Sequence, residues 1–152
     1  MSSQANIELA RRFIDELWNQ RKYEVADELF SEDFVTHSIS NEPAAWEGKG
    51  PESMKNHIKH WLVAVPDMQF TAHHVIADEG HFVIHWSAAG TNLSPFMGIP
   101  ATGKPVNLLG MTIYHVKDGK IALNQTIVDS LGFLQQLEAL PDNATILSQA
   151  RE

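Results

Sequence analysis

The stretch LLGMTIYHVKDGKIALNQTIVD, residues 108–129, decides the fold class. Apolar and polar residues alternate on both sides of a Lys-Asp-Gly-Lys turn at residues 117–120, and a period of two is typical of half-buried strands. Asp-Gly between two such runs is a strong hairpin signal, because both turn positions require positive φ angles. We therefore predict strands at residues 108–116 and 121–128, paired as an antiparallel hairpin.

Two further strands are expected before this hairpin. Residues 68–74 alternate in the same way, and residues 82–88 are rich in apolar and aromatic side chains. The loop at residues 92–105 places proline and glycine around apolar residues such as Phe96 and Met97. A stiff apolar loop of this kind suits the rim or lid of a pocket better than a plain solvent loop.

The N-terminal half has a helical period instead. Between residues 7 and 18, apolar positions follow the i, i+3, i+4, i+7 rule, with charged residues on the opposite face. Shorter helices are predicted at residues 25–30 and 130–140. A longer one is predicted to begin near Gly50-Pro51, with proline in its first turn, and to end at Pro66-Asp67. Helices followed by a series of strands indicate the α+β class, with helices packed on one face of an antiparallel sheet.

Length and composition limit the alternatives. The 152 residues fit one domain, which we place at residues 1–140, with a mobile or partner-binding tail at residues 141–152. The net charge of -8 opposes binding to nucleic acid or to anionic membranes. No apolar run approaches the roughly 20 residues of a membrane span and no signal peptide is visible, so a cytoplasmic protein is expected.

Most cofactor chemistry is disfavoured by the residues present. The chain has no cysteine, which excludes disulfides and thiolate chemistry. Among the eight histidines, the pairs His57/His60 and His81/His85 share a face but have no third ligand at matching spacing, so no metal is expected. No phosphate loop or dinucleotide fingerprint occurs, and the chain has no nucleophile elbow for covalent catalysis.

Asp129 is the only charged residue between Lys120 and Glu138. An isolated carboxylate in apolar company suits acid/base chemistry on a hydrophobic substrate, because removal from water raises the pKa of a carboxyl group. Aspartate is also a favoured helix N-cap, and Ser130 begins the predicted last helix. Both interpretations stay open, and one residue can fill both roles.

Several motifs in fixed order resemble the SnoaL-like polyketide cyclases of the NTF2-like superfamily. They are PDMQF at residues 66–70, W…GT at 86–91, FMGIPATGKP at 96–105, DGKI at 118–121 and D…LG…LQQL at 129–137. The resemblance implies an NTF2-like cone, in which N-terminal helices pack on a curved antiparallel sheet and a short C-terminal helix follows. It also implies a homodimer formed through the outer sheet faces.

The same resemblance implies a cofactor-independent intramolecular aldol condensation of a hydrophobic carbonyl substrate. In the family, the acid/base is the aspartate just before the last helix, and a histidine of the penultimate strand lies beside the substrate. These positions correspond here to Asp129 and His115. Strand register opposes their pairing: Lys117 opposite Lys120 places His115 opposite Ala122, so His115 and Asp129 fall on different faces unless a β-bulge intervenes.

Further side chains are candidates for substrate binding. His37 falls where related sequences bring a polar residue to the pocket, although an exposed loop histidine is an equal alternative. Gln125 shares the face of Asp129 in the ideal register, and a satisfied core amide explains it equally well. The expected apolar lining residues, which ordinary core packing also explains, are Trp18, Trp61, Phe96, Met97 and Met111.

The alternative function is a small-molecule binding or dimerising module that keeps the cone without the chemistry. The strand that follows DGKI often carries acidic residues and a tryptophan in the family, whereas this chain has Leu123, Asn124 and Gln125. An exposed Asp129 that caps the last helix, with no enclosed pocket beside it, would favour this alternative.

Overall fold

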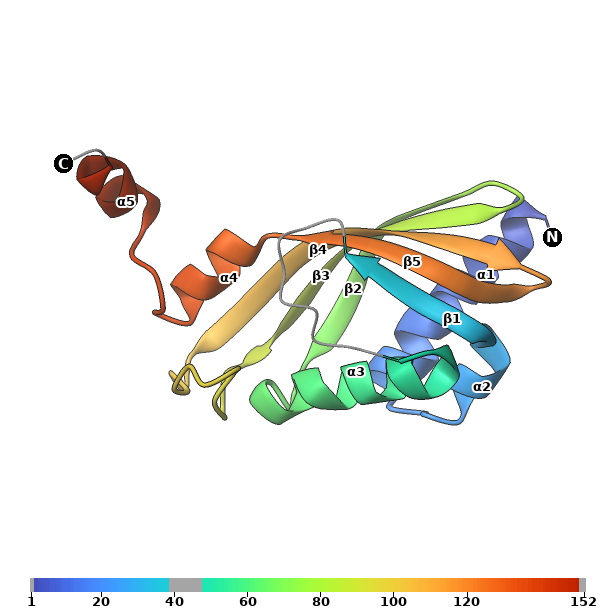
Figure 1. Ribbon diagram of the computed structural model, residues 1–152, viewed down its shortest axis with the longest axis horizontal. Coiled ribbons are helices and arrows are strands. Elements are labelled where there is room, and N and C mark those ends of the chain that lie inside the picture. Colours follow the sequence, from blue (N-terminus) through green and yellow to red (C-terminus); the bar gives the residue numbers. More distant parts are fainter. Residues whose placement is uncertain (1, 39–47, 151–152) are drawn as a thin grey trace.

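The computed structural model describes residues 2–38 and 48–150. The helices are α1 (Ser3–Arg12), the π-helical segment η1 (Phe13–Asn19), α2 (Val25–Leu29), α3 (Gly50–Ala64), α4 (Ser130–Gln136) and α5 (Asn143–Gln149). The strands are β1 (Phe30–Ser38), β2 (Gln69–Ala77), β3 (His81–Thr91), β4 (Pro105–Lys117) and β5 (Lys120–Val128). They form one sheet in the order β1-β5-β4-β3-β2. The first three helices and η1 lie on one side of this sheet, which confirms the expected α+β cone (Figure 1).

The sheet is antiparallel apart from β1, which pairs in parallel with β5. We did not expect this strand, because the polar run Ser31-Glu32-Asp33 interrupts any alternation. The register with β5 shifts between Phe30 and Val35, so neighbouring residues of β1 do not follow a simple two-residue period. The interpretation of His37 as a loop residue is therefore wrong, since it lies within β1.

The hairpin predicted from Asp-Gly is confirmed. Asp118 and Gly119 have φ angles of 51° and 77°, as the turn requires, and Lys117 pairs with Lys120. Beyond the turn the register shifts, so that His115 pairs with Leu123 rather than with Ala122. The predicted partner of His115 was thus wrong by one residue, because a β-bulge inserts an extra residue into β5.

The core fills the space between the helices and the inner face of the sheet. Along β3 and β4, buried and more exposed residues alternate, and the even-numbered positions face inward. The largest fully buried side chains include Phe13 of η1, Phe34 of β1 and Phe82 of β3. Their burial supplies much of the stability of the domain, because large apolar side chains are removed from water.

The C-terminal tail contains a short helix. Asp142 caps α5 by accepting a hydrogen bond from the Thr145 backbone N–H at 2.8 Å. No residue of α5 is buried, and the helix lies away from the rest of the molecule (Figure 1). Within the described residues, no helix combines the length and the apolar character needed to cross a membrane.

Candidate functional site

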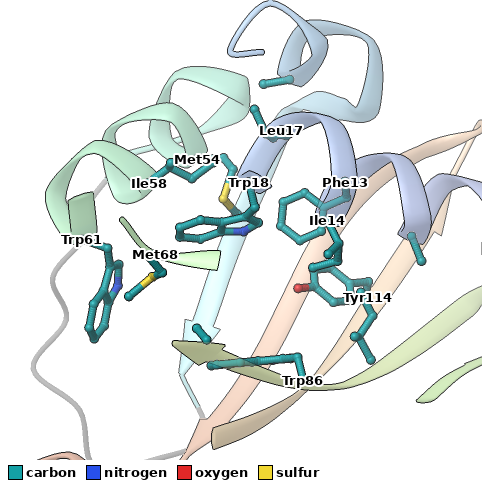
Figure 2. Packing of buried hydrophobic residues seen from close by; sticks show 14 of the residues in the cluster. Phe13, Ile14, Leu17, Trp18, Met54, Ile58, Trp61, Met68, Trp86 and Tyr114 are labelled. Carbon is teal, nitrogen blue, oxygen red and sulfur yellow. The ribbon is translucent and has the colours of Figure 1, made fainter. Parts of the chain in front are cut away.

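A cavity lies between the helical layer and the inner face of the sheet. Its volume is about 60 Å³, which is room for about four water molecules. Figure 2 shows Trp18 of η1, Trp61 of α3 and Trp86 of β3 approaching this space from three different elements. The lining residues are Phe13, Ile14, Trp18, Thr36, Met54, His57, Trp61, Met68, Phe70, Trp86, Leu108, Thr112, Tyr114, Asn124, Thr126 and Val128.

Two groups of aromatic rings in tilted contact form the apolar walls or support them from behind. In one, the ring centroid of Phe70 lies 4.3 Å from that of Trp18 and 5.1 Å from that of Trp86. In the other, Trp61 lies 5.0 Å from Phe96 and 5.5 Å from Phe133. Such a wall favours planar apolar ligands, because aromatic rings pack well in offset and edge-on arrangements.

The absence of a side chain at Gly110 determines how Trp86 lies. The two residues pair across β3 and β4, and a Cβ atom at Gly110 would come within 2.4 Å of the indole ring. Trp86 therefore lies across Gly110 and donates a hydrogen bond from Nε1 to Thr112 Oγ1 at 3.0 Å. Thr112 in turn shares a 3.0 Å hydrogen bond with Thr126. The sheet side of the cavity thus carries a row of hydrogen-bonded polar atoms, from Trp86 through Thr112 to Thr126, surrounded by apolar side chains.

Tyr114 and Asn124 continue this polar row on paired positions of β4 and β5. Burial raises the pKa of the Tyr114 hydroxyl, so it stays protonated at neutral pH. Asn124 is only 6% exposed, and its Oδ1 atom has no hydrogen-bond partner within residues 2–38 and 48–150. A buried amide oxygen in this position can accept a hydrogen bond from a ligand.

His57 is the functional candidate that the sequence analysis missed. It comes from α3, lines the cavity opposite the sheet, and packs edge-on against Trp18 with ring centroids 5.8 Å apart. Removal from water lowers its pKa to about 3, and nearby His60 adds to the effect. The spacing of Met54, His57 and Trp61 on one helix face was the signal available, but we considered His57 only as a partner of His60 for a metal.

Asp129 is not part of the cavity lining. It follows Val128, a lining residue, and its backbone N–H donates to Leu109 at 2.9 Å. The side chain is exposed and caps α4, because its Oδ1 accepts a hydrogen bond from the Gly132 N–H at 2.9 Å. The structure therefore shows the capping role directly, with the carboxylate one residue beyond the lined part of β5.

The structure places three other predicted site residues on the outer face of the sheet. His115 and Gln125 face outward together, and Nε2 of His115 donates to Oε1 of Gln125 at 3.2 Å. Met111 lies on the same face and is 49% exposed. None of the three lines the cavity. The bulge in β5 brings His115 and Gln125 to one face, but to the face opposite the cavity.

The remaining predicted residues are divided between the cavity, its rim and the surface. Trp18 and Trp61 are in the cavity wall. Phe96 packs against Trp61 from the loop after β3 and covers it from outside, whereas Met97 is 51% exposed. His37 is exposed on β1, while its neighbour Thr36 lines the cavity.

The cavity wall is uncharged. Among the described residues, the lining includes no Asp, Glu, Lys or Arg, and its titratable side chains are His57 and Tyr114. The described part of the chain also holds no group of three His, Cys, Asp or Glu side chains arranged to bind a metal ion. The arrangement can enclose a small uncharged molecule against aromatic rings and offer it hydrogen bonds from one side.

The described residues thus form an α+β cone around an uncharged, largely aromatic cavity. The chain belongs to the SnoaL-like polyketide cyclase family, whose family model matches residues 8–137. The comparison with curated proteins gave no significant match.

Solved structures share this fold. A putative polyketide cyclase from Acidithiobacillus ferrooxidans is 27% identical, with a TM-score of 0.76 over 91% of this chain and 97% of that one. IdmH, a putative polyketide cyclase from Streptomyces antibioticus, is 25% identical, with a TM-score of 0.72 over 86% and 96%. TsrD from Streptomyces laurentii is 24% identical, with a TM-score of 0.80 over 92% and 99%, and this likeness concerns the fold alone.

Proposed function

We propose that the chain is a cofactor-independent enzyme of the polyketide-cyclase type. It binds a hydrophobic carbonyl compound in the cavity and uses Asp129 as acid/base for an intramolecular aldol condensation. The observation that carries this proposal is the position of Asp129 at the end of the cavity-lining strand β5 in a chain of this family. Because the cavity is small, we expect one ring or chain end of a larger substrate to enter it.

The reaction needs one proton acceptor that later returns the proton. The Asp129 carboxylate takes a proton from a carbon next to a carbonyl group, and the resulting enolate carbon attacks a second carbonyl carbon of the same molecule. A carbon–carbon bond forms, and the new alkoxide takes the proton back from the carboxylic acid. Since Asp129 is exposed, the bound substrate has to displace water from the carboxylate to strengthen it as a base.

Two substitutions separate this chemistry from helix capping. Asp129→Asn keeps an N-cap side chain of nearly equal quality but removes the carboxylate, whereas Asp129→Ala removes both. We expect Asp129→Asn to lower turnover of a diketone or aromatic poly-β-ketone that the wild type closes by about a hundredfold or more, with little change in thermal stability. Unchanged turnover in Asp129→Asn would contradict the mechanism.

A second candidate function is ligand binding without chemistry. The observation in its favour is that Asp129 is exposed, bonded to the Gly132 N–H and outside the cavity lining. In that case, ligands should raise the melting temperature of the wild type and of Asp129→Asn alike. Neither protein should then close the ring of any diketone or aromatic poly-β-ketone that is tested. Ring closure by the wild type excludes this alternative.

We also propose that the chain forms a homodimer through its outer sheet face. Exposed apolar side chains gather there on neighbouring strands, among them Leu109, Met111 and Ile127 at 44%, 49% and 49% exposure. Exposed apolar patches of this kind mark interaction surfaces. Light scattering should show a dimer for the wild type and a monomer for Met111→Lys combined with Ile127→Lys. Val63→Lys, at a 64% exposed position of α3, is the matched control.

A further inference from the structure

The polar side chains that line the cavity differ in whether their hydrogen-bonding atoms have partners within the described protein. Thr112 bonds both Trp86 and Thr126. Asn124 is also buried, yet its Oδ1 has no partner in the described part of the chain. Since a buried polar atom without a hydrogen bond destabilises the folded state, a ligand donor at this position would gain the interaction that the described residues do not make.

The position of Asn124 directs its side chain toward the ligand space. Its backbone belongs to β5, with Tyr114 of β4 and Thr36 of β1 as paired neighbours. All three residues line the cavity. The amide therefore lies in the sheet wall between two other lining residues.

His57 supplies a second polar group from the opposite, helical wall. It is held edge-on against Trp18, which fixes the plane of its ring. Because removal from water keeps the imidazole neutral, one ring nitrogen is a donor and the other an acceptor. A neutral histidine of this kind can polarise a carbonyl group without carrying a charge.

We propose that His57 and Asn124 form an uncharged hydrogen-bonding pair that holds the polar substituents of a neutral, ring-bearing ligand and discriminates against carboxylates. His57 donates to a carbonyl oxygen, and Asn124 Oδ1 accepts from a hydroxyl, enol or amide group of the same ligand. A carboxylate is excluded because the described lining offers no cation to replace its hydration. This inference rests on the proposed use of the cavity as the ligand site, but not on chemistry at Asp129.

Benzamide and benzoate form a suitable pair of probes. Both are single planar rings with a carbonyl group, but benzamide is neutral and carries N–H donors, whereas benzoate is an anion at pH 7.5. We expect ligand-observed NMR titrations of the full chain to show at least about tenfold tighter binding of benzamide. His57→Phe and Asn124→Leu should each weaken benzamide binding about fivefold or more, because each removes one hydrogen bond and retains bulk.

Matched controls come from exposed positions of α3. His60→Phe and Asn56→Leu make the same chemical changes outside the cavity lining and should bind benzamide like the wild type. Thermal unfolding checks that each variant is folded, and Asn124→Ala replaces Asn124→Leu if the larger side chain prevents folding.

The outcomes separate this inference from the proposed function. Equal binding of the two probes, or wild-type benzamide binding by both cavity variants, would overturn the inference and leave the proposed use of the cavity intact. Failure of the wild type to bind either probe would overturn both, because the cavity would then not be a ligand site for small planar rings. Turnover measurements on Asp129→Asn do not affect either result.

Discussion

Both faces of the sheet carry large apolar side chains, but these side chains have very different surroundings. On β4, Leu108 and Tyr114 face inward and are buried, whereas Leu109, Met111 and Ile113 face outward and are 39–49% exposed. The inner face encloses a cavity because η1 and α3 cover it. The alternation of residues along a strand thus assigns side chains to two faces of the sheet. Which face encloses a cavity depends on which one the helices cover.

The histidines show the same contrast. The outer face carries pairs, with a 3.1 Å hydrogen bond between His74 and His85 and ring centroids of His81 and His115 4.7 Å apart. The described part of the cavity wall has a single histidine, His57, which comes from a helix. A count of histidines along the strands therefore directs attention to the outer face, although the imidazole that faces the cavity belongs to α3.

The largest expected difference between the faces is in packing. Phe82→Ala on the inner face should lower the free energy of unfolding by about 3–5 kcal/mol, because it leaves a cavity in the core. Ile76→Ala on the outer face removes a side chain that is 67% exposed and should cost less than about 1 kcal/mol. Urea denaturation measures both, and losses of equal size would contradict the assignment of the two faces.

A substitution at Gly110 tests how closely Trp86 lies against the sheet. Gly110→Val should cost about 3 kcal/mol, because the new side chain would overlap the buried indole. Met111→Val, one residue along on the outer face, is the control and should have little effect on stability. Equal stability of Gly110→Val and the wild type would show that the Trp86 indole does not have to lie against residue 110.

The pH dependence of stability tests the state of His57. Its pKa is about 3 in the folded chain and 6.5 in the unfolded chain, so below pH 6.5 the unfolded chain binds a proton that the folded chain does not. Stability should therefore fall as the pH falls from 6.5 toward 3. Between pH 7 and pH 5, the wild type should lose about 2 kcal/mol relative to His57→Gln in thermal unfolding.

The exposed histidine of the same helix provides the control. His60→Gln keeps His57 and should follow the wild type over this pH range. Parallel curves for the wild type and His57→Gln would show that the imidazole is not kept neutral by the cavity.

The smallest expected effect is at Asp129, where only a helix cap changes. Asp129→Ala should cost about 1 kcal/mol, and Asp129→Asn much less, because asparagine caps helices nearly as well. Differential scanning calorimetry at neutral pH resolves the two. Equal losses for both variants would mean that the carboxylate stabilises the chain by its charge and not only by the bond to Gly132.

Much of the fold was predictable because its signals are local. The Asp118-Gly119 turn, the strands beside it and the amphipathic helix before Trp18 each follow from neighbouring residues. Strand β1 was not predictable in this way, because the polar residues at 31–33 break its period and the strand it pairs with, β5, is far away in sequence.

The candidate site was less predictable than the fold. Trp18 and Trp61 were identified by bulk and apolar character, and they line the cavity. Register arithmetic opposed His115 and favoured Gln125 as a neighbour of Asp129, but the one-residue bulge that decides the face of both leaves no signal in the sequence. His57 and Asn124 were missed because the role of a polar residue depends on its burial and on its neighbours in space, which the local sequence does not show.

The sequence by itself determined the α+β class, the hairpin and, through ordered motifs, the SnoaL-like family. These features depend on periodicity and turn chemistry, which act between residues close in the chain. Only the tertiary structure decided that Asp129 caps α4 outside the cavity lining, that His115 faces outward, and that His57 and Asn124 share one cavity. Those outcomes depend on a bulge and on burial, which are set by contacts between distant segments.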